Sequence, residues 1–122
     1  MAAGIYNFTI EQGATFTRQF KYKNSEGVGI DLTNYAVRMQ IRKNIGASTP
    51  ELSLTESATP NGSLLSVGSG DDVNVITLTI TAADTSTMSF DTAVYDLEID
   101  LLNVVTRLLQ GKIKLSKEVT RD

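Results

Sequence analysis

Apolar and polar residues alternate along residues 94–101, the clearest pattern in the chain. The two sets are Tyr95, Leu97, Ile99 and Leu101 against Asp96, Glu98 and Asp100. Successive side chains of a strand point to opposite faces of a sheet, so this alternation predicts one buried and one solvated face. The segment 109–115 repeats the pattern after a predicted turn near 102–104. Together the two segments predict a β-hairpin over 94–115.

Shorter segments with strand-like patterns precede this hairpin and are separated by clusters of turn-forming residues. They are predicted at 5–10, 14–23, 36–43, 51–56, 63–67 and 73–80, with a short extended piece at 30–33. About seven to nine short strands with regularly spaced turns are typical of an all-β sandwich or barrel. We therefore predict a single antiparallel β-sandwich domain over residues 1–122.

Two local features depart from the strand pattern. Arg18 shares its parity with the aromatic residues of the strand predicted at 14–23. Three placements are open for it: pairing inside the fold, a bulge that shifts the register, or an edge strand. One short helical turn is predicted near 81–88, with Thr81 as its N-cap and Asp84 as an acidic capping-box partner.

The amino-acid composition narrows the range of functions expected for the chain. The chain has 122 residues, of which 41% are apolar, and it contains neither cysteine nor histidine. Disulfides, thiolate chemistry and the commonest general base near neutral pH are therefore absent. The net charge of −3 argues against a basic nucleic-acid binder. No apolar run is long enough to span a membrane, and residues 1–4 do not resemble a signal peptide. We expect a non-enzymatic protein, synthesised in a cytoplasm, that uses no cofactor or metal.

Acidic residues offer two candidate metal sites, and each has a plainer interpretation. Asp96, Glu98 and Asp100 project from one strand face about 6.6 to 7 Å apart, too far to share one ion without help. A solvated or salt-bridged sheet face is the favoured interpretation. Asp71 and Asp72 are a slightly better Ca²⁺ candidate, yet a plain polar loop is favoured there as well.

Basic and aromatic residues offer candidate partner contacts. A basic face for an acidic partner would form if the strands bearing Arg38, Arg42, Lys21 and Lys23 are neighbours. Pairing of these cations with the carboxylates at 96, 98 and 100 is the favoured alternative. Two aromatic residues in turn-like contexts, Tyr35 and Phe90, are either exposed or plug one end of the sandwich. Phe16, Phe20 and Tyr95 are expected in the core.

The N-terminal segment is the first candidate for docking. Chain termini are loosely held until a partner orders them, and open strand edges pair readily. We therefore expect segment 2–10 to contact a partner through Tyr6, Phe8 and Ile10, with the loop-rich stretch 44–72 as the second candidate. Tyr35, Arg38 and Arg42 complete the predicted contacts.

Several blocks together resemble small virion proteins of tailed phages. The stretch 31–42 resembles their "D-L-T-G-Y-x-V-R-M-Q-I-R" block, and 76–85 resembles "I-T-L-T-L-S-A-A-E-T". The hairpin resembles "Y-D-L-E-L" followed by "V-T-R-L-L-E-G" at residues 95–99 and 105–111. Residues 16–20 and 119–121 match the family's opening and closing blocks. The order of the blocks is the order expected for that family.

This resemblance implies an immunoglobulin-like sandwich that acts in a virion. The family includes N-terminal modules that attach baseplate or fibre components in some phages. The first expectation is therefore a tail, baseplate or fibre-attachment adaptor, present in multiple copies and contacting other virion proteins, although the resemblance does not fix the location in the particle. We expect no fibre, spike or receptor-binding domain after residue 122, and such a stand-alone module would act as an adaptor, hub or decoration rather than as a receptor binder. Two alternatives stay open: a capsid decoration or head–tail connector protein, and a carbohydrate- or Ca²⁺-binding surface module.

The strand register predicted for 94–101 can be tested by two substitutions. Leu97→Asp should lower the free energy of unfolding by about 3 kcal/mol or more, because it buries a charge. Glu98→Lys should change it by no more than roughly 0.5 kcal/mol, since its side chain is predicted to face solvent. Denaturant unfolding of both variants measures the difference, and a reversed order would show that the register is wrong.

Overall fold

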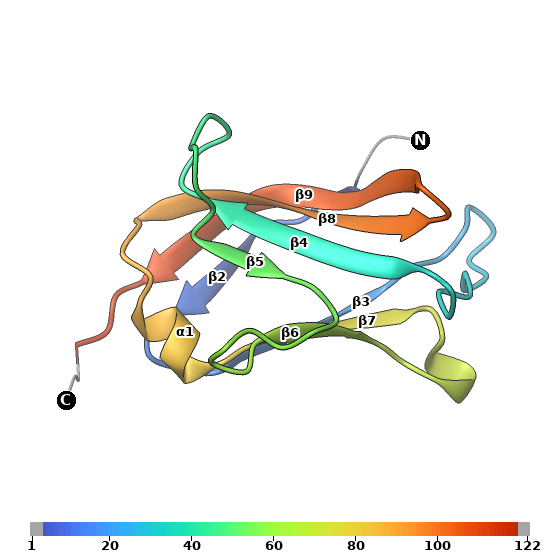
Figure 1. The fold of residues 1–122 in the computed structure, drawn as a ribbon, viewed down its shortest axis with the longest axis horizontal. Coiled ribbons are helices and arrows are strands. Elements are labelled where there is room, and N and C mark those ends of the chain that lie inside the picture. The colour runs from blue at the N-terminus through green and yellow to red at the C-terminus, as the bar shows by residue number, and fades with distance from the viewer. Residues whose placement is uncertain (1–3, 120–122) are drawn as a thin grey trace.

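Two β-sheets face each other in the structure, a computed structural model that describes residues 4–119 (Figure 1). A single helix of one to two turns and one 3₁₀ turn accompany the strands within this range. The elements in chain order are β1 (Gly4–Ile5), β2 (Phe8–Glu11), β3 (Phe16–Lys21), β4 (Ala36–Arg42), β5 (Leu52–Leu54), β6 (Leu64–Val67), η1 (Gly70–Asp72), β7 (Val75–Ile80), α1 (Ala82–Ser86), β8 (Thr92–Leu101) and β9 (Val104–Ser116).

The larger sheet has six strands and the smaller has three. Strands β9, β8, β4 and β5 follow one another in the larger sheet, with β1 and β2 both alongside β9. The smaller sheet has the order β3-β7-β6. The predicted sandwich arrangement is confirmed, but not a wholly antiparallel one, because β1 and β2 run parallel to β9. The chain enters along the C-terminal strand and then crosses to the smaller sheet as β3.

The core lies between the two sheets and is built from the apolar parity of each strand. The hairpin prediction is confirmed: Tyr95, Leu97 and Ile99 of β8 are buried, and β8 pairs with β9 along its whole length. The register shifts between Leu97 and Glu98. This irregularity places Arg107 opposite Glu98 on the outer face, while Leu109 lies opposite Leu97 on the inner face.

Arg18 lies inside the fold on an edge strand, so two of its three predicted placements hold together. β3 forms one edge of the smaller sheet. The Arg18 guanidinium lies 5.2 Å from the centre of the Phe16 ring and donates a hydrogen bond to the Tyr6 hydroxyl. Phe16 stacks on Phe8 at 5.1 Å between ring centres. Through its contacts with Phe16 and Tyr6, Arg18 therefore joins the open sides of the two sheets.

Two predicted local elements need correction. Residues 30–33 form no strand; Leu32 is buried, and its carbonyl accepts a hydrogen bond from Tyr35 across a turn. Thr81 does cap α1, accepting a hydrogen bond from the Asp84 backbone N–H at 3.4 Å. The reciprocal capping-box bond is absent, because the Thr81 backbone N–H donates to the Ser63 hydroxyl at 2.9 Å.

The Asp84 carboxylate instead fastens the loop before β6 onto α1. It accepts hydrogen bonds from the hydroxyls of Thr59, at 2.9 Å, and Ser63, and from the Asn61 amide at 2.9 Å. Burial raises the pKa of Asp84, but the hydrogen bonds from Ser63, Asn61 and Thr59 together outweigh it, so the pKa lies below its usual value. Three hydrogen bonds to one buried carboxylate stabilise this end of the sandwich.

Asp84→Asn should destabilise the fold in a pH-dependent way. At neutral pH we expect a loss of about 1–3 kcal/mol in the free energy of unfolding, because the amide cannot accept all three bonds. The carboxylate's stabilisation is present above the unfolded pKa and lost as pH falls below about 4. Melting temperatures from pH 7 to pH 3 should therefore converge for the two proteins, and parallel curves would contradict this role.

Candidate partner-binding groove and hairpin tip

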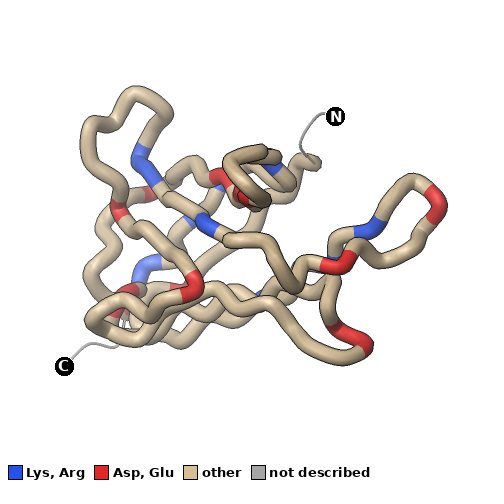
Figure 2. The backbone as a smooth tube through the Cα atoms, turned by 45° about the vertical axis from the view of Figure 1, so that its right-hand side comes forward, with Lys and Arg blue, Asp and Glu red and all other residues tan. Residues whose placement is uncertain are grey.

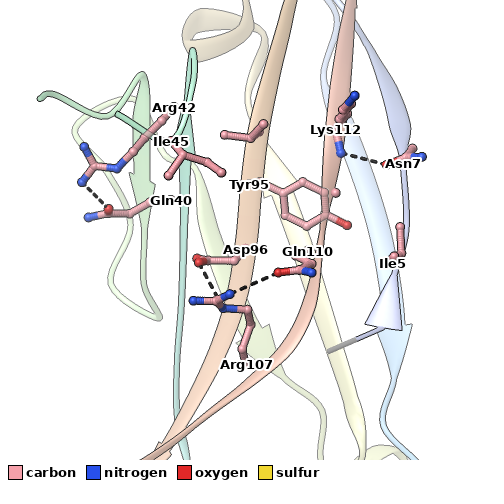
Figure 3. A pocket seen from close by; sticks show the side chains of 12 residues that line it. Ile5, Asn7, Gln40, Arg42, Ile45, Tyr95, Asp96, Arg107, Gln110 and Lys112 are labelled. Carbon is pink, nitrogen blue, oxygen red and sulfur yellow. Dashed lines mark hydrogen bonds and ion pairs between the residues drawn. The ribbon is translucent and has the colours of Figure 1, made fainter. Parts of the chain in front are cut away.

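A groove of about 560 Å³ opens on the outer face of the six-stranded sheet (Figure 3). Strands β4, β8 and β9 form its floor, while the loop 43–51 and the N-terminal segment flank it. In Figure 1 this loop rises away from the six-stranded sheet. The residues that set its chemistry are Ile5, Arg42, Ile45, Asp96, Arg107 and Lys112.

Hydrogen bonds hold both flanks in place. The Arg42 guanidinium donates to the Ala47 carbonyl at 2.7 Å and to the Gln40 side-chain oxygen at 2.8 Å, which ties the loop to β4. On the opposite side, the Tyr95 hydroxyl donates to the Tyr6 carbonyl at 2.5 Å. Burial, with a smaller contribution from Tyr6, raises the pKa of Tyr95 to about 12, so the phenol keeps this proton at neutral pH.

A glycine lets the N-terminal segment come close to the sheet. Gly111 lies opposite Tyr95, and a Cβ added there would collide with the Tyr6 carbonyl oxygen. The Lys112 backbone N–H next to it donates to the Asn7 side-chain oxygen at 2.8 Å. The groove wall formed by residues 5–7 therefore depends on Gly111 having no side chain.

The groove carries more positive than negative charge. Asp96 pairs with Arg107 at 3.5 Å, and Arg107 also donates to the Gln110 side chain at 3.1 Å. Burial and the neighbouring Glu98 raise the pKa of Asp96, while Arg107 acts to lower it. The Lys112 ammonium has no hydrogen-bond or ion-pair partner within residues 4–119. Asp96 is thus the one acidic residue that lines the groove, together with the cations Arg42, Arg107 and Lys112.

Apolar side chains lie exposed on both flanks of the groove. Ile45 is 88% exposed in the loop, and Ile5 is 76% exposed on β1. Large apolar residues scattered singly on a surface are ordinary, but two that flank one concave site with three cations form a surface suited to an amphipathic partner. Ile45 is the one large apolar residue in the polar stretch 43–50, and this is the sequence feature that could have indicated the flank.

The larger basic face that the sequence allowed does not form. Arg38 pairs with Glu98 at 2.8 Å and with Asp100 at 4.0 Å, as expected for cross-strand pairing. Lys21 belongs to β3 in the other sheet, so Lys21 and Lys23 do not extend the surface around Arg38 and Arg42. Glu98→Lys would place a third cation beside Arg38 and Arg107, so its expected cost rises to about 1 kcal/mol.

The predicted N-terminal contacts divide between core and surface. Phe8 and Ile10 are buried, so their side chains stabilise this chain's own core and leave no surface for a partner. They are fixed by β2, which pairs with β9 from Phe8 to Glu11. Tyr6 is half-buried and bonded to Arg18. Residues 2 and 3 of the predicted docking segment lie outside the described residues.

The other predicted site residues lie apart from the groove, except Arg42. Phe90 is buried and Tyr35 is half-buried against the core, so this pair does not form an exposed aromatic platform. Asp71 and Asp72 lie in η1. Within the part of the chain that is described, no group of three or more acidic, histidine or cysteine residues could hold a metal ion. No helix there is long and apolar enough to cross a membrane.

A second surface feature, the hairpin tip, was not anticipated as a contact site. It comprises Leu102 and Asn103, the two turn residues between β8 and β9, and Val104 and Val105, the first two residues of β9. Leu102 is 89% exposed and Val104 is 68% exposed. The backbone φ angles of Leu102 and Asn103 are 50° and 69°. A leucine in the left-handed region is unfavourable, because such turns favour asparagine, aspartate or glycine.

The charges of the groove are coupled, which gives a direct test of its geometry. Arg107→Gln should raise the pKa of Asp96 further, because it removes the cation that lies 3.5 Å away. Glu98→Gln should lower it, because it removes a like charge. Carbon-13 NMR titration of the Asp96 carboxyl group measures both shifts. Equal pKa values in the three proteins would show that these side chains do not meet.

No family model matches the chain, and no curated protein matches its sequence. The resemblance to phage virion proteins therefore rests on the sequence blocks alone. The structure of residues 4–119 shows a mostly β fold of two sheets, with a cationic groove and an exposed apolar hairpin tip.

Proposed function

We propose that the chain is a non-enzymatic structural protein of a tailed-phage particle and acts through protein–protein contacts. In this proposal it is an immunoglobulin-like module at the tail, where it serves as a baseplate or fibre-attachment adaptor in multiple copies. The observation that carries the proposal is the hairpin tip. The sequence blocks that resemble small virion proteins support its location in a particle.

The hairpin tip combines two features, each of which is energetically unfavourable in the isolated chain. Leu102 adopts a backbone conformation that costs an ordinary L-residue about 1–2 kcal/mol. The same residue exposes its apolar side chain to water, together with Val104 and Val105. Neither feature improves this chain's own core. A partner that buries the tip would recover the apolar contact, which is a physical reason for keeping leucine at this position.

Packing and turn chemistry make the tip a suitable contact element. The tip joins β8 and β9, and β8 is paired with β9 along its whole length, so the sheet sets the position of the tip. The Asp100 side chain accepts a hydrogen bond from the Asn103 backbone N–H at 3.0 Å, which fixes the turn. A rigid apolar projection loses little conformational freedom when it binds, and this favours affinity.

The alternatives differ in what supports them. A capsid decoration or head–tail connector protein would also use protein–protein contacts, so the tip supports that alternative equally. A glycan-binding module would need exposed aromatic rings, whereas Phe90 is buried and Tyr35 is half-buried. The sequence blocks that resemble virion proteins include those of attachment modules in some phages, which is the reason for proposing the tail first, but they do not fix the location in the particle.

Copy number and location in a purified particle test the proposal first. Cryo-electron microscopy with quantitative mass spectrometry should find the chain at the tail in a multiple of three or six, the symmetry of tail assemblies. Hundreds of copies on the shell would identify a decoration protein instead. Absence from the particle would overturn the structural role.

Leu102→Asn separates the contact role of the tip from its role in folding. Asparagine tolerates the left-handed conformation, so we expect the free energy of unfolding to rise by a few tenths to about 1 kcal/mol. Incorporation of this variant into particles should nevertheless fall sharply, because the apolar contact is lost. Quantitative mass spectrometry of particles from complemented infections measures this.

Val119→Asn is the matched control, since Val119 is exposed and lies outside the hairpin tip. It should be incorporated like the unmodified chain. Normal incorporation of Leu102→Asn would remove the tip from the proposed interface.

A further inference from the structure

Acidic side chains gather at the end of the sandwich that carries the hairpin tip. The loops 22–35 and 68–74 lie at this end, joined by a hydrogen bond from the Leu32 N–H to the Val73 carbonyl at 2.9 Å. β4 begins there as well, with Ala36 opposite Asp100 just before the tip. Figure 2 marks acidic positions in red along the projecting loops of this end, and the acidic residues exposed there are Glu26, Asp31, Asp71 and Asp72.

These four carboxylates outnumber the two lysines near them, Lys21 and Lys23. None of the four is in an ion pair with another described residue. The tip is therefore an apolar projection on an acidic end. Because the whole chain has a net charge of −3, much of its negative charge lies where the tip would meet a partner.

The groove has the complementary character. Its flanks are apolar through Ile5 and Ile45, and three cations, Arg42, Arg107 and Lys112, line it with a single acidic residue, Asp96. A volume of about 560 Å³ accommodates a leucine and a valine side chain on a two-residue turn, as it falls within the usual range of binding pockets. An apolar projection with acidic surroundings matches this groove in shape, polarity and charge.

A chain cannot place its tip in its own groove. Both belong to the β8–β9 hairpin, where Asp96 on the groove floor and Leu102 in the tip are six residues apart. A strand rises about 3.3 Å per residue, so the two lie roughly 20 Å apart on a paired, extended hairpin. A tip that fills a groove must come from another molecule.

We propose that the hairpin tip of one copy binds in the groove of a second copy, so that copies join head to tail. This inference rests on the proposed structural function and names its partner as another molecule of this chain. When one such contact joins two copies, the copy that gave its tip keeps a free groove, and the other copy keeps a free tip. Such contacts close into rings, of which a reciprocal dimer with two tip-in-groove contacts is the smallest, or they continue as filaments.

Analytical ultracentrifugation of the full chain over a range of concentrations tests the inference. The unmodified chain should form a dimer or larger species as concentration rises, and added salt should weaken them because opposite charges face each other across the contact. Lys112→Glu should weaken association at low salt, with a smaller effect at high salt. A chain that stays monomeric at the highest concentration would overturn the inference.

Two variants and their mixture identify the surfaces. Leu102→Asn removes the most exposed apolar side chain of the tip. Ile45→Asp places a negative charge on the exposed flank of the groove, which would repel the acidic loops around the tip. Each alone should associate at least about tenfold more weakly, a loss of about 1.4 kcal/mol, while Val119→Asn behaves like the unmodified chain. The mixture should form a one-to-one complex and nothing larger, because one variant keeps its groove and the other keeps its tip.

The mixture is decisive because tip-to-tip or groove-to-groove contacts predict no such complex. Circular dichroism melting of both variants verifies that they are folded. If the mixture fails to associate while the unmodified chain does, the contact uses other surfaces and the inference is wrong. If self-association is absent but Leu102→Asn is still lost from particles, the tip docks on a different protein, and the proposed function stands without this inference.

Discussion

The register of β8 against its two neighbours is the constraint on which the other features depend. Ala93, Tyr95, Leu97 and Ile99 of this strand are buried between the sheets, so a slip by one residue would place acidic residues in the core. That cost fixes the pairing of β8 with both β4 and β9. It also decides which charges face outward and where the hairpin must turn.

The outward charges follow from this register. Pairing with β4 brings Arg38 to Glu98, and the irregularity in β9 brings Arg107 beside Asp96. Each of these contacts is partly exposed and contributes little to stability by itself. Their larger effect is on the surface, because they neutralise much of the acidic strand and leave Arg42 and Lys112 as the cations that determine the character of the groove.

Stability and binding use different parts of the chain. The aromatic residues joined by Arg18 and the Asp84 network fasten the open side and one end of the sandwich, and their polar groups are paired within the fold. The hairpin tip and the flanks of the groove instead expose apolar side chains that contribute nothing to the core. This division is what a module is expected to have when it must fold first and then assemble with other molecules.

The sequence by itself determined the strands, the β8–β9 hairpin, its turn and the N-cap at Thr81, because each depends on local alternation or on residues a few positions apart. It misplaced Phe8 and Ile10 as partner contacts and missed the parallel pairing of β2 with β9, since no local pattern shows which strand lies beside a terminus. Only the tertiary structure decided the groove, where residues from 5 to 112 meet. The register of non-adjacent strands, set by burial across the whole core, brought those side chains together.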